Sequence, residues 1–257
     1  GLALGGMPPN KNYDIPNKPH DIDTNKEARK EWKKKAVIAH TENARMFSKR
    51  LLYAKILWEA DKFKSYKTIY FPLQLDFRGR AYCVPAFLNY QSISGAKALL
   101  KFSYGKAITE ENKGDFWLAV HGANMWGKDK QSLQDRVKWV EQNQDMIINC
   151  ALDPFTNRQW EDASSPFQAL AFCEEWRQFK EQGYGFESSI PVSIDGSCNG
   201  LQLYSLMLRD EHAGKLVNVV PADEPQDIYQ LVADAVTEKL KEDAKADKPY
   251  AQKWLDY

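Results

Sequence analysis

A long segment without helix breakers constrains the fold of this chain more than any other feature of its sequence. Residues 26–64 contain neither proline nor glycine, and apolar residues recur there at steps of three and four. Because this spacing places apolar side chains on one face of an α-helix, the segment predicts one long helix or two consecutive ones. The preceding residues 1–25 hold four prolines and three glycines, which predicts a loop or an extended arm.

Charge is balanced over the whole chain but uneven along it. The 257 residues carry 35 Lys and Arg against 35 Asp and Glu, whereas residues 1–110 carry 20 basic and only 10 acidic residues. The first part of the long helix is especially basic, and such a helix could follow a phosphate backbone. A solvated helix face explains the same charges without any ligand.

Several classes of protein are disfavoured by composition. A hydrophobic content of 43% with 12% aromatic residues is typical of a folded globular protein. No apolar run approaches the roughly 18 residues of a membrane span. We expect no secretory signal, because the N-terminal run GLALGGMPPN lacks a basic stretch followed by an apolar one. The four cysteines are separated by 67, 23 and 25 positions, which fits neither a zinc site nor a disulfide framework, so we expect reduced thiols.

The remaining pattern predicts a mainly helical fold with a small mixed β-sheet, that is, an α+β protein. Short apolar or β-branched runs predict strands at residues 68–75, 81–87 and 190–194. Helical periodicity predicts helices around residues 115–125, 132–152, 166–182, 200–209 and 225–243.

The sharpest local motif is the run from Ser193 to Gln202, with the sequence SIDGSCNGLQ. It places Asp195 after an apolar run and before a glycine-rich turn that leads into a helix. A carboxylate there, together with the main-chain carbonyl of Gly196, could bind Mg²⁺ for phosphoryl or nucleotidyl transfer. An Asp-Gly turn whose side chain caps the next helix is the alternative, and Asp-Gly turns are common.

A second motif combines arginine with aromatic residues. In the run DFRGRAY, Arg78 and Arg80 flank Gly79 between Phe77 and Tyr82. Guanidinium groups beside aromatic rings suit contacts with phosphates and stacked bases. A salt bridge from Asp76 to one arginine is the structural alternative, and the two roles are compatible.

Taken in order, these motifs resemble the single-subunit DNA-dependent RNA polymerases of T7-like phages and, more distantly, of mitochondria. The resemblance extends from about Asp21 to Leu255. The blocks that carry it are FPLQLDFRGRAY at 71–82, HGAN at 121–124, GKDK at 127–130, DRVKW at 135–139, SPF at 165–167, ALAFC at 169–173, DGSCNGLQ at 195–202, MLRDE at 207–211, VN at 217–218 and QDIY at 226–229. One departure is Leu203, where relatives often have histidine, which puts any role of that histidine in doubt here.

The resemblance implies roles for individual residues. Asp195 would be the first catalytic aspartate and would bind Mg²⁺ with the carbonyl of Gly196. Lys130 would contact the phosphates of the incoming nucleotide, and Tyr229 would lie at the nucleotide site. Arg78 and Arg80 would touch the template strand.

The resemblance also implies a partial right-hand polymerase fold. It comprises a basic helical thumb portion at 1–66, palm at 67–104 and 187–211, a helical insertion at 105–186, and the start of the fingers at 212–257. The implied activity is DNA-templated RNA synthesis from nucleoside triphosphates, with DNA template and promoter, nascent RNA and nucleotides as partners of a monomeric enzyme. MLRDE is more phage-like than organellar, which predicts the cytoplasm of an infected bacterium, with the mitochondrion as second choice.

The sequence also leads us to expect an internal fragment of such an enzyme. The chain begins without methionine, and the second catalytic aspartate and the nucleotide-gripping fingers helix of the family have no counterpart in it. We therefore expect the isolated chain to bind nucleic acid weakly and to catalyse nothing. Two alternatives stay open: a non-catalytic nucleic-acid-binding module, and a family DNA polymerase, against which the DGSCNGLQ and DFRGR blocks argue.

Overall fold

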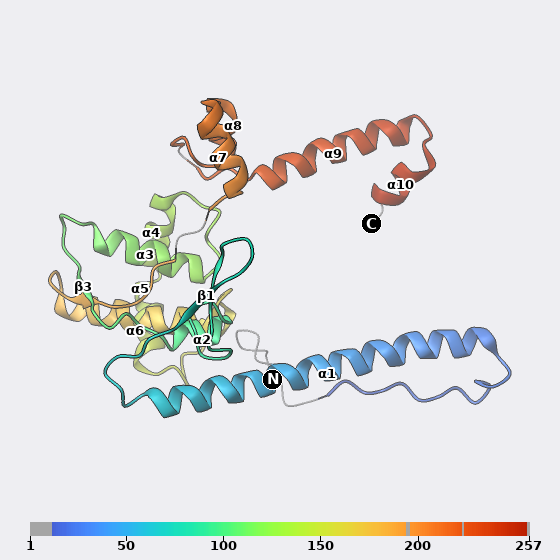
Figure 1. Cartoon of the computed structure of the whole chain (residues 1–257), viewed down its shortest axis with the longest axis horizontal. Coiled ribbons are helices and arrows are strands. Elements are labelled where there is room, and N and C mark those ends of the chain that lie inside the picture. Colours follow the sequence, from blue (N-terminus) through green and yellow to red (C-terminus); the bar gives the residue numbers. More distant parts are fainter. Residues whose placement is uncertain (1–11, 194–195, 223, 256–257) are drawn as a thin grey trace. The chain divides into compact units, whose positions relative to one another are not determined.

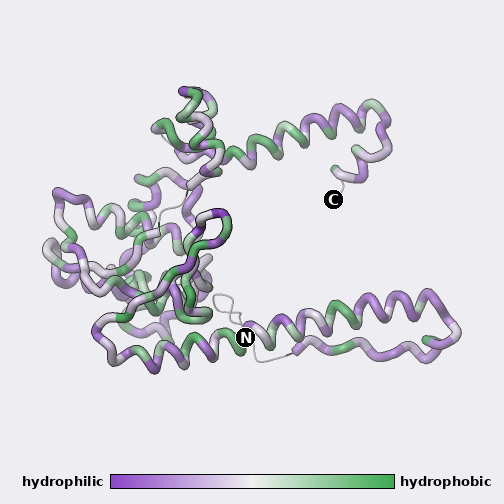
Figure 2. The backbone as a smooth tube through the Cα atoms, viewed as in Figure 1, coloured by the Kyte–Doolittle hydropathy of each residue, from purple (hydrophilic) through white to green (hydrophobic). Residues whose placement is uncertain are grey.

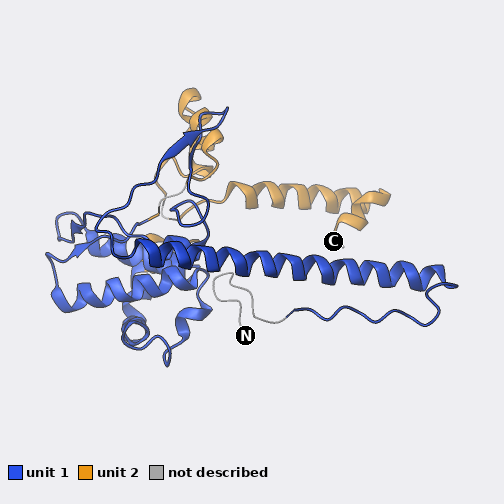
Figure 3. Ribbon diagram, turned by 60° about the horizontal axis from the view of Figure 1, so that its bottom comes forward, with its two compact units in different colours: residues 1–128, 137–192 blue, residues 129–136, 193–257 orange. Residues whose placement is uncertain are grey.

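A computed structural model describes residues 12–193, 196–222 and 224–255 of the chain. The chain divides into two compact units (Figure 3). Unit 1 comprises residues 1–128 and 137–192, and unit 2 comprises residues 129–136 and 193–257.

The residues predicted as one or two long helices form a single helix, α1 (Lys26–Phe63). Asn25 caps its start, because its side-chain oxygen accepts a hydrogen bond from the backbone N–H of Ala28 at 3.0 Å. Hydrophilic residues prevail in the N-terminal half of α1 (Figure 2). In the C-terminal half, Ile56 packs into a small core with Leu88 and Ala96.

An extended segment precedes α1 and runs back along it (Figure 1). Asn43 of the helix exchanges two hydrogen bonds with the backbone of Tyr13, at 2.7 and 2.9 Å. The indole N–H of Trp32 donates to the carbonyl of Pro16 at 2.8 Å. The predicted extended arm is therefore confirmed over residues 12–19, where side chains of α1 bond the backbone at Tyr13 and Pro16.

The β structure of the described residues consists of two small antiparallel sheets. β1 (Leu73–Leu75) pairs with β2 (Ala81–Cys83), and β3 (Lys106–Ala107) pairs with β4 (Glu187–Ser188). The predicted α+β class is confirmed, but the strands do not form one mixed sheet. The strand predicted at 190–194 is not formed over the described residues 190–193, where Pro191 has no N–H to donate to a ladder.

Helices build the main core of unit 1. They are α2 (Ser94–Ala98), α3 (Gly114–Met125), α4 (Leu133–Gln142, whose first turn belongs to unit 2), α5 (Gln144–Leu152), the 3₁₀ helix η2 (Gln159–Asp162) and α6 (Pro166–Gln182). The helices predicted around 115–125 and 166–182 are confirmed, and the one at 132–152 is split at Asn143.

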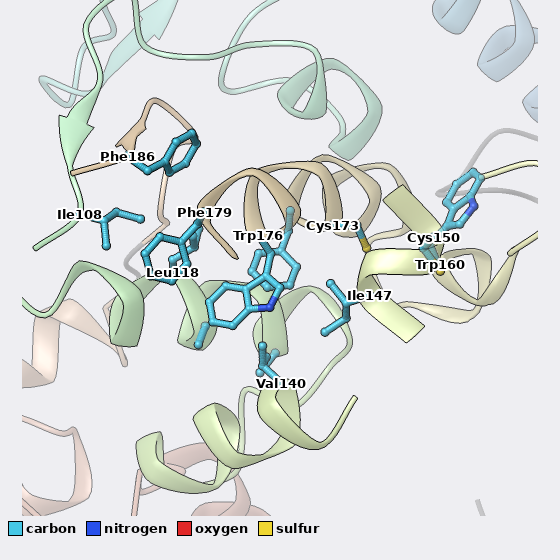
Figure 4. Close-up of a cluster of buried hydrophobic side chains, with 13 residues drawn as sticks. Ile108, Leu118, Val140, Ile147, Cys150, Trp160, Cys173, Trp176, Phe179 and Phe186 are labelled. Carbon is cyan, nitrogen blue, oxygen red and sulfur yellow. The ribbon is translucent and has the colours of Figure 1, made fainter. Parts of the chain in front are cut away.

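The buried face of α6 is the centre of this core. Phe172, Trp176 and Phe179 of α6 lie among buried residues of α3, α4 and α5 (Figure 4). Successive rings in this row are 5.7 Å apart between centroids. Gly122 of α3 packs so closely on Phe172 that a β-carbon at position 122 would overlap the phenyl ring.

The buried carboxylate of Glu175 joins α6 both to Lys101, which precedes the helix in the chain, and to the segment that follows it. Glu175 is 1% exposed and accepts hydrogen bonds from Lys101 Nζ at 2.6 Å, Ser188 Oγ at 2.7 Å and the Ser189 N–H at 2.9 Å. Burial alone would raise the pKa of Glu175, but the hydrogen bonds from Lys101 and Ser188 outweigh it and hold that pKa below its usual value. The carboxylate therefore fixes β4 against α6.

The regular secondary structure among the described residues of unit 2 is helical. It contains α7 (Asn199–Leu208), α8 (Glu211–Leu216), α9 (Ile228–Lys245) and α10 (Pro249–Leu255). The helices predicted around 200–209 and 225–243 correspond to α7 and α9. Among the described residues of both units, no helix has the length and apolar character that a membrane span requires. The division into thumb, palm, insertion and fingers stays a prediction.

Candidate functional site

The predicted metal ligands belong to the start of the second segment of unit 2, residues 193–257. Asp195 itself lies outside the described residues, whereas Gly196 is described and exposed. The helix predicted after this turn is confirmed, since α7 begins at Asn199. Gln202 of α7 reaches back toward the turn, and its amide oxygen would lie 3.3 Å from a β-carbon at Gly196.

Lys130 belongs to the same unit and lies beside the start of α9. Its ammonium group is 3.5 Å from Asp227 Oδ2 and 3.9 Å from Asp129 Oδ2. The Lys130 side chain is 76% exposed, so these pairs hold it weakly and leave it accessible to an anion. The lysine is thus free to exchange a carboxylate partner for a phosphate.

Asp227 connects this lysine to Tyr229. Its Oδ1 accepts hydrogen bonds from the backbone N–H groups of Tyr229 at 3.1 Å and Gln230 at 3.3 Å, which caps α9. The hydrogen bond from the Gln230 N–H, followed by that from Tyr229 and by the charge of Lys130, holds the pKa of Asp227 below its usual value. Asp227 is therefore ionised at neutral pH.

The Tyr229 side chain is exposed at the first turn of α9. A side-chain hydrogen bond with Cys198 raises the pKa of Tyr229. Cys198 is the residue that precedes α7 and belongs to the DGSCNGLQ motif. The structure therefore brings Tyr229 to the turn of Gly196, although the two residues are far apart in the sequence.

Arg136 supports the loop that bears Lys130, a role that the sequence analysis did not assign. Arg136 is 7% exposed, and its guanidinium donates to the carbonyls of Asp129 at 2.7 Å and Gln131 at 2.9 Å. These bonds fix the backbone on both sides of Lys130. Burial lowers the pKa of Arg136, but an arginine stays charged at neutral pH.

Asn218 is a second residue that the sequence analysis missed. Its side-chain amide is bonded to Ser197 and to the backbone of Gln226. The VN block contained this asparagine, but its partners lie 21 and 8 positions away. No local pattern identifies such a contact.

The two arginines predicted at the template belong to unit 1, in the turn between β1 and β2. The Arg78 guanidinium donates to Asp76 Oδ2 from Nε at 3.0 Å and from Nη2 at 2.9 Å. It also lies 5.3 Å from the ring centroid of Phe77, which is 96% exposed. Arg80 is exposed, and its backbone N–H donates to Asp76 Oδ1 at 2.9 Å. The salt bridge considered for Asp76 is thus present, and it involves Arg78.

A divalent cation is the cofactor that the sequence predicts for the turn of Gly196. No cluster of three or more His, Cys, Asp and Glu side chains occurs within the part of the chain that the structure describes. The exposed Gly196 does present a main-chain carbonyl next to Asp195 in the sequence, and oxygen donors are what Mg²⁺ prefers. The donors at this turn therefore fit Mg²⁺ in kind.

Comparison with known proteins identifies the family. The family model described as DNA-dependent RNA polymerase matches residues 109–257. The chain is 44% identical over 241 residues to the DNA-directed RNA polymerase of Enterobacteria phage T3, which covers 94% of this chain and 27% of the relative. It is 41% identical over 238 residues to T7 RNA polymerase of Escherichia phage T7, covering 93% and 27%.

A mitochondrial relative matches nearly the whole chain as well. The mitochondrial DNA-directed RNA polymerase of Neurospora crassa is 33% identical over 256 residues, covering 98% of this chain and 18% of the relative. The chain spans about a quarter of the length of the two phage relatives. The predicted resemblance is confirmed: the chain belongs to the DNA-dependent RNA polymerase family.

Proposed function

We propose that this chain contributes the metal and nucleotide site of a single-subunit RNA polymerase that copies DNA into RNA. The observation that supports this most is the assembly of unit 2. Lys130 and Tyr229 come from segments about 100 residues apart, yet both contact the Asp227 cap of α9, and Tyr229 also contacts the turn after Gly196. A cation, an exposed aromatic ring and a predicted metal-binding turn are what a nucleoside triphosphate requires.

Each residue has a separate role in this proposal. Asp195 and the carbonyl of Gly196 hold Mg²⁺, which would supply activation of the 3′-hydroxyl and stabilisation of the pyrophosphate leaving group. Lys130 leaves Asp227 and balances the charge of the triphosphate. Tyr229 lies against the nucleotide, while Arg78 and Arg80 contact the template strand through its phosphates.

The proposal extends to the organisation and the partners of the protein. Residues 1–66 form a thumb portion, 67–104 and 187–211 the palm, 105–186 an insertion, and 212–257 the start of the fingers. The partners are the DNA template with its promoter, the nascent RNA and nucleoside triphosphates, bound by a monomer. The cytoplasm of an infected bacterium is the proposed location.

The test is extension of an RNA primer on a DNA template by the product of the whole open reading frame that holds this sequence. We expect template- and Mg²⁺-dependent incorporation of nucleotides, reduced at least about 1,000-fold by Asp195→Asn because the substitution removes a metal ligand. Asp153→Asn is the control, since Asp153 lies in a turn of unit 1, where its carboxylate accepts hydrogen bonds from the backbone N–H groups of Phe155 and Thr156. Its incorporation rate should match that of the unsubstituted protein.

A non-catalytic nucleic-acid-binding module is the second candidate, favoured by the basic start of α1. That candidate predicts binding of DNA and RNA without incorporation, and equal binding by the Asp195→Asn variant. Such a result would replace the catalytic proposal.

A further inference from the structure

Asn218 lies in the connection between α8 and α9 in a backbone conformation that few residues adopt. Its φ angle is 59°, in the left-handed region. Asparagine tolerates this region better than other residues with a β-carbon, and glycine adopts it freely. The backbone N–H of Asn218 donates to the Lys215 carbonyl at 3.2 Å, so the left-handed turn closes the end of α8.

The side chain of Asn218 uses both its donor and its acceptor. Nδ2 donates to Ser197 Oγ at 2.9 Å and to the Gln226 carbonyl at 2.8 Å, and Oδ1 accepts from the Gln226 N–H at 2.7 Å. The orientation of the amide is fixed by its partners, because a backbone N–H must face the oxygen and a carbonyl must face the nitrogen.

These three bonds join two segments that the proposed function places at opposite ends of the substrate. Ser197 follows Gly196 directly and lies two positions after Asp195. Gln226 directly precedes Asp227, which contacts both Lys130 and the backbone of Tyr229. One amide therefore connects the turn that would hold the metal to the helix start that would hold the nucleotide.

We propose that Asn218 is a positioning residue that sets the spacing between the metal end and the nucleotide end of this site. The inference rests on the proposed function and adds a residue to it. A two-metal reaction needs the triphosphate and the metal in one fixed geometry, and a displacement of about 1 Å can cost roughly 100-fold in rate. No other residue type combines a left-handed backbone with two such donors and an acceptor at this length of side chain.

The decisive variant is Asn218→Gly in the product of the whole open reading frame. Glycine keeps the left-handed backbone without strain and removes all three side-chain bonds. In primer extension we expect the KM for nucleoside triphosphates to rise at least about 5-fold and kcat/KM to fall about 10- to 100-fold. The Mg²⁺ concentration for half-maximal rate should rise as well, because the distance between the metal turn and the start of α9 is no longer fixed.

Asn112→Ala is the matched control for loss of stability. The Asn112 amide also makes three bonds in a turn, to the Ala107 carbonyl at 2.8 Å and from the N–H groups of Thr109 at 3.1 Å and Gly114 at 2.9 Å, but it lies in unit 1. We expect this variant to lower the melting temperature while KM and kcat stay within about 2-fold. Equal kinetics for Asn218→Gly and Asn112→Ala would overturn the proposal.

Hydrogen exchange of backbone amides separates this inference from the proposed function. Asn218→Gly should speed exchange in residues 197–202 and 226–230, whereas Asn112→Ala should leave both segments unchanged. Unaltered exchange in Asn218→Gly overturns the inference whether or not the protein makes RNA. If the unsubstituted protein makes no RNA, the proposed function fails, and exchange still decides whether Asn218 joins the two segments.

Discussion

At the scale of residues, the carboxylate of Asp76 pairs with the side chain of Arg78 but only with the backbone N–H of Arg80. Asp76 Oδ1 accepts from the backbone N–H groups of Arg78 at 2.8 Å and Arg80 at 2.9 Å, while Oδ2 binds the Arg78 guanidinium. The hydrogen bond from the Arg80 N–H, followed by the one from the Arg78 side chain, holds the pKa of Asp76 below its usual value. Arg78 therefore shapes the turn, and the exposed Arg80 is better placed to meet a phosphate.

This inequality predicts different effects of two substitutions on DNA binding. Arg80→Ala should weaken binding of template DNA and reduce the slope of log Kobs against log salt concentration by about 0.7 to 0.9, the value for one phosphate contact. Arg78→Ala should change that slope less, because its charge is already paired with Asp76. Titrations at four or more salt concentrations measure the slopes, and equal slopes for both variants would contradict this assignment.

His121 makes the stability of unit 1 depend on pH. The side chain is 1% exposed, and its Nδ1 has no hydrogen-bond partner among the described residues. Burial lowers the pKa of His121 from 6.5 to about 4. Below pH 6.5 the imidazole of His121 is therefore protonated in the unfolded chain but stays neutral in the folded chain. The folded state loses stability as the pH falls toward 4.

Between pH 6.5 and 4 we expect the free energy of unfolding to fall by roughly 3 kcal/mol, which corresponds to a pKa difference of about 2.5 between the folded and unfolded states. Urea unfolding of the chain at several pH values measures it. His121→Leu should flatten this part of the pH profile, because it removes the buried imidazole whose protonation the folded state disfavours. A profile with the same slope in both proteins would show that another residue is responsible.

At the scale of elements, the close contact between α3 and α6 requires a glycine at position 122. Gly122 lies against the ring of Phe172, which leaves no space for a β-carbon. In an exposed helix, replacing glycine by alanine stabilises by about 1 kcal/mol. Here the overlap should dominate, because added volume in a packed core costs about 1–3 kcal/mol.

We therefore expect Gly122→Ala to lower the free energy of unfolding by about 1–2 kcal/mol in urea titrations. Gly200→Ala is the matched control, since Gly200 is also helical but nothing lies within 4 Å of its added β-carbon. That control should be neutral or stabilising. A Gly122→Ala variant as stable as Gly200→Ala would contradict the close packing of α3 on α6.

Long helices were predictable from the sequence, whereas very short strands and contacts between distant segments were not. α1 and α6 were predictable because periodic apolar residues span them without interruption. β3 and β4 were missed because each has two residues and their pairing depends on contacts about 80 positions apart. Lys130 and Tyr229 were predicted from motifs, but Arg136 and Asn218 act through backbone atoms of distant or irregular segments, which no periodicity indicates.

At the scale of the whole molecule, the exposed apolar residues of α7 predict self-association of this chain. The chain spans about a quarter of the phage relatives it matches. α7 exposes Leu203, Tyr204, Leu206, Met207 and Leu208, a run of apolar side chains that a folded protein seldom leaves in water. We expect the chain of 257 residues to bind a hydrophobic dye and to self-associate with rising concentration.

Substitution within this run tests that expectation. Met207→Lys and Leu203→Lys together should reduce dye fluorescence and self-association in sedimentation velocity, because charge replaces apolar surface. Val37→Lys in α1 is a control at one exposed apolar residue outside unit 2. If the control reduces self-association as strongly as the α7 variant, the apolar run of α7 is not the cause.

Metal-directed cleavage of the backbone shows whether the turn at Asp195 and Gly196 holds the catalytic metal. Iron(II) replaces Mg²⁺ in the product of the whole open reading frame, and ascorbate with peroxide then generates hydroxyl radicals that cut the backbone next to the bound ion. We expect cuts concentrated at residues 193–198, suppressed by excess Mg²⁺ and lost in Asp195→Asn. Cuts elsewhere, or unchanged cuts in Asp195→Asn, would contradict it.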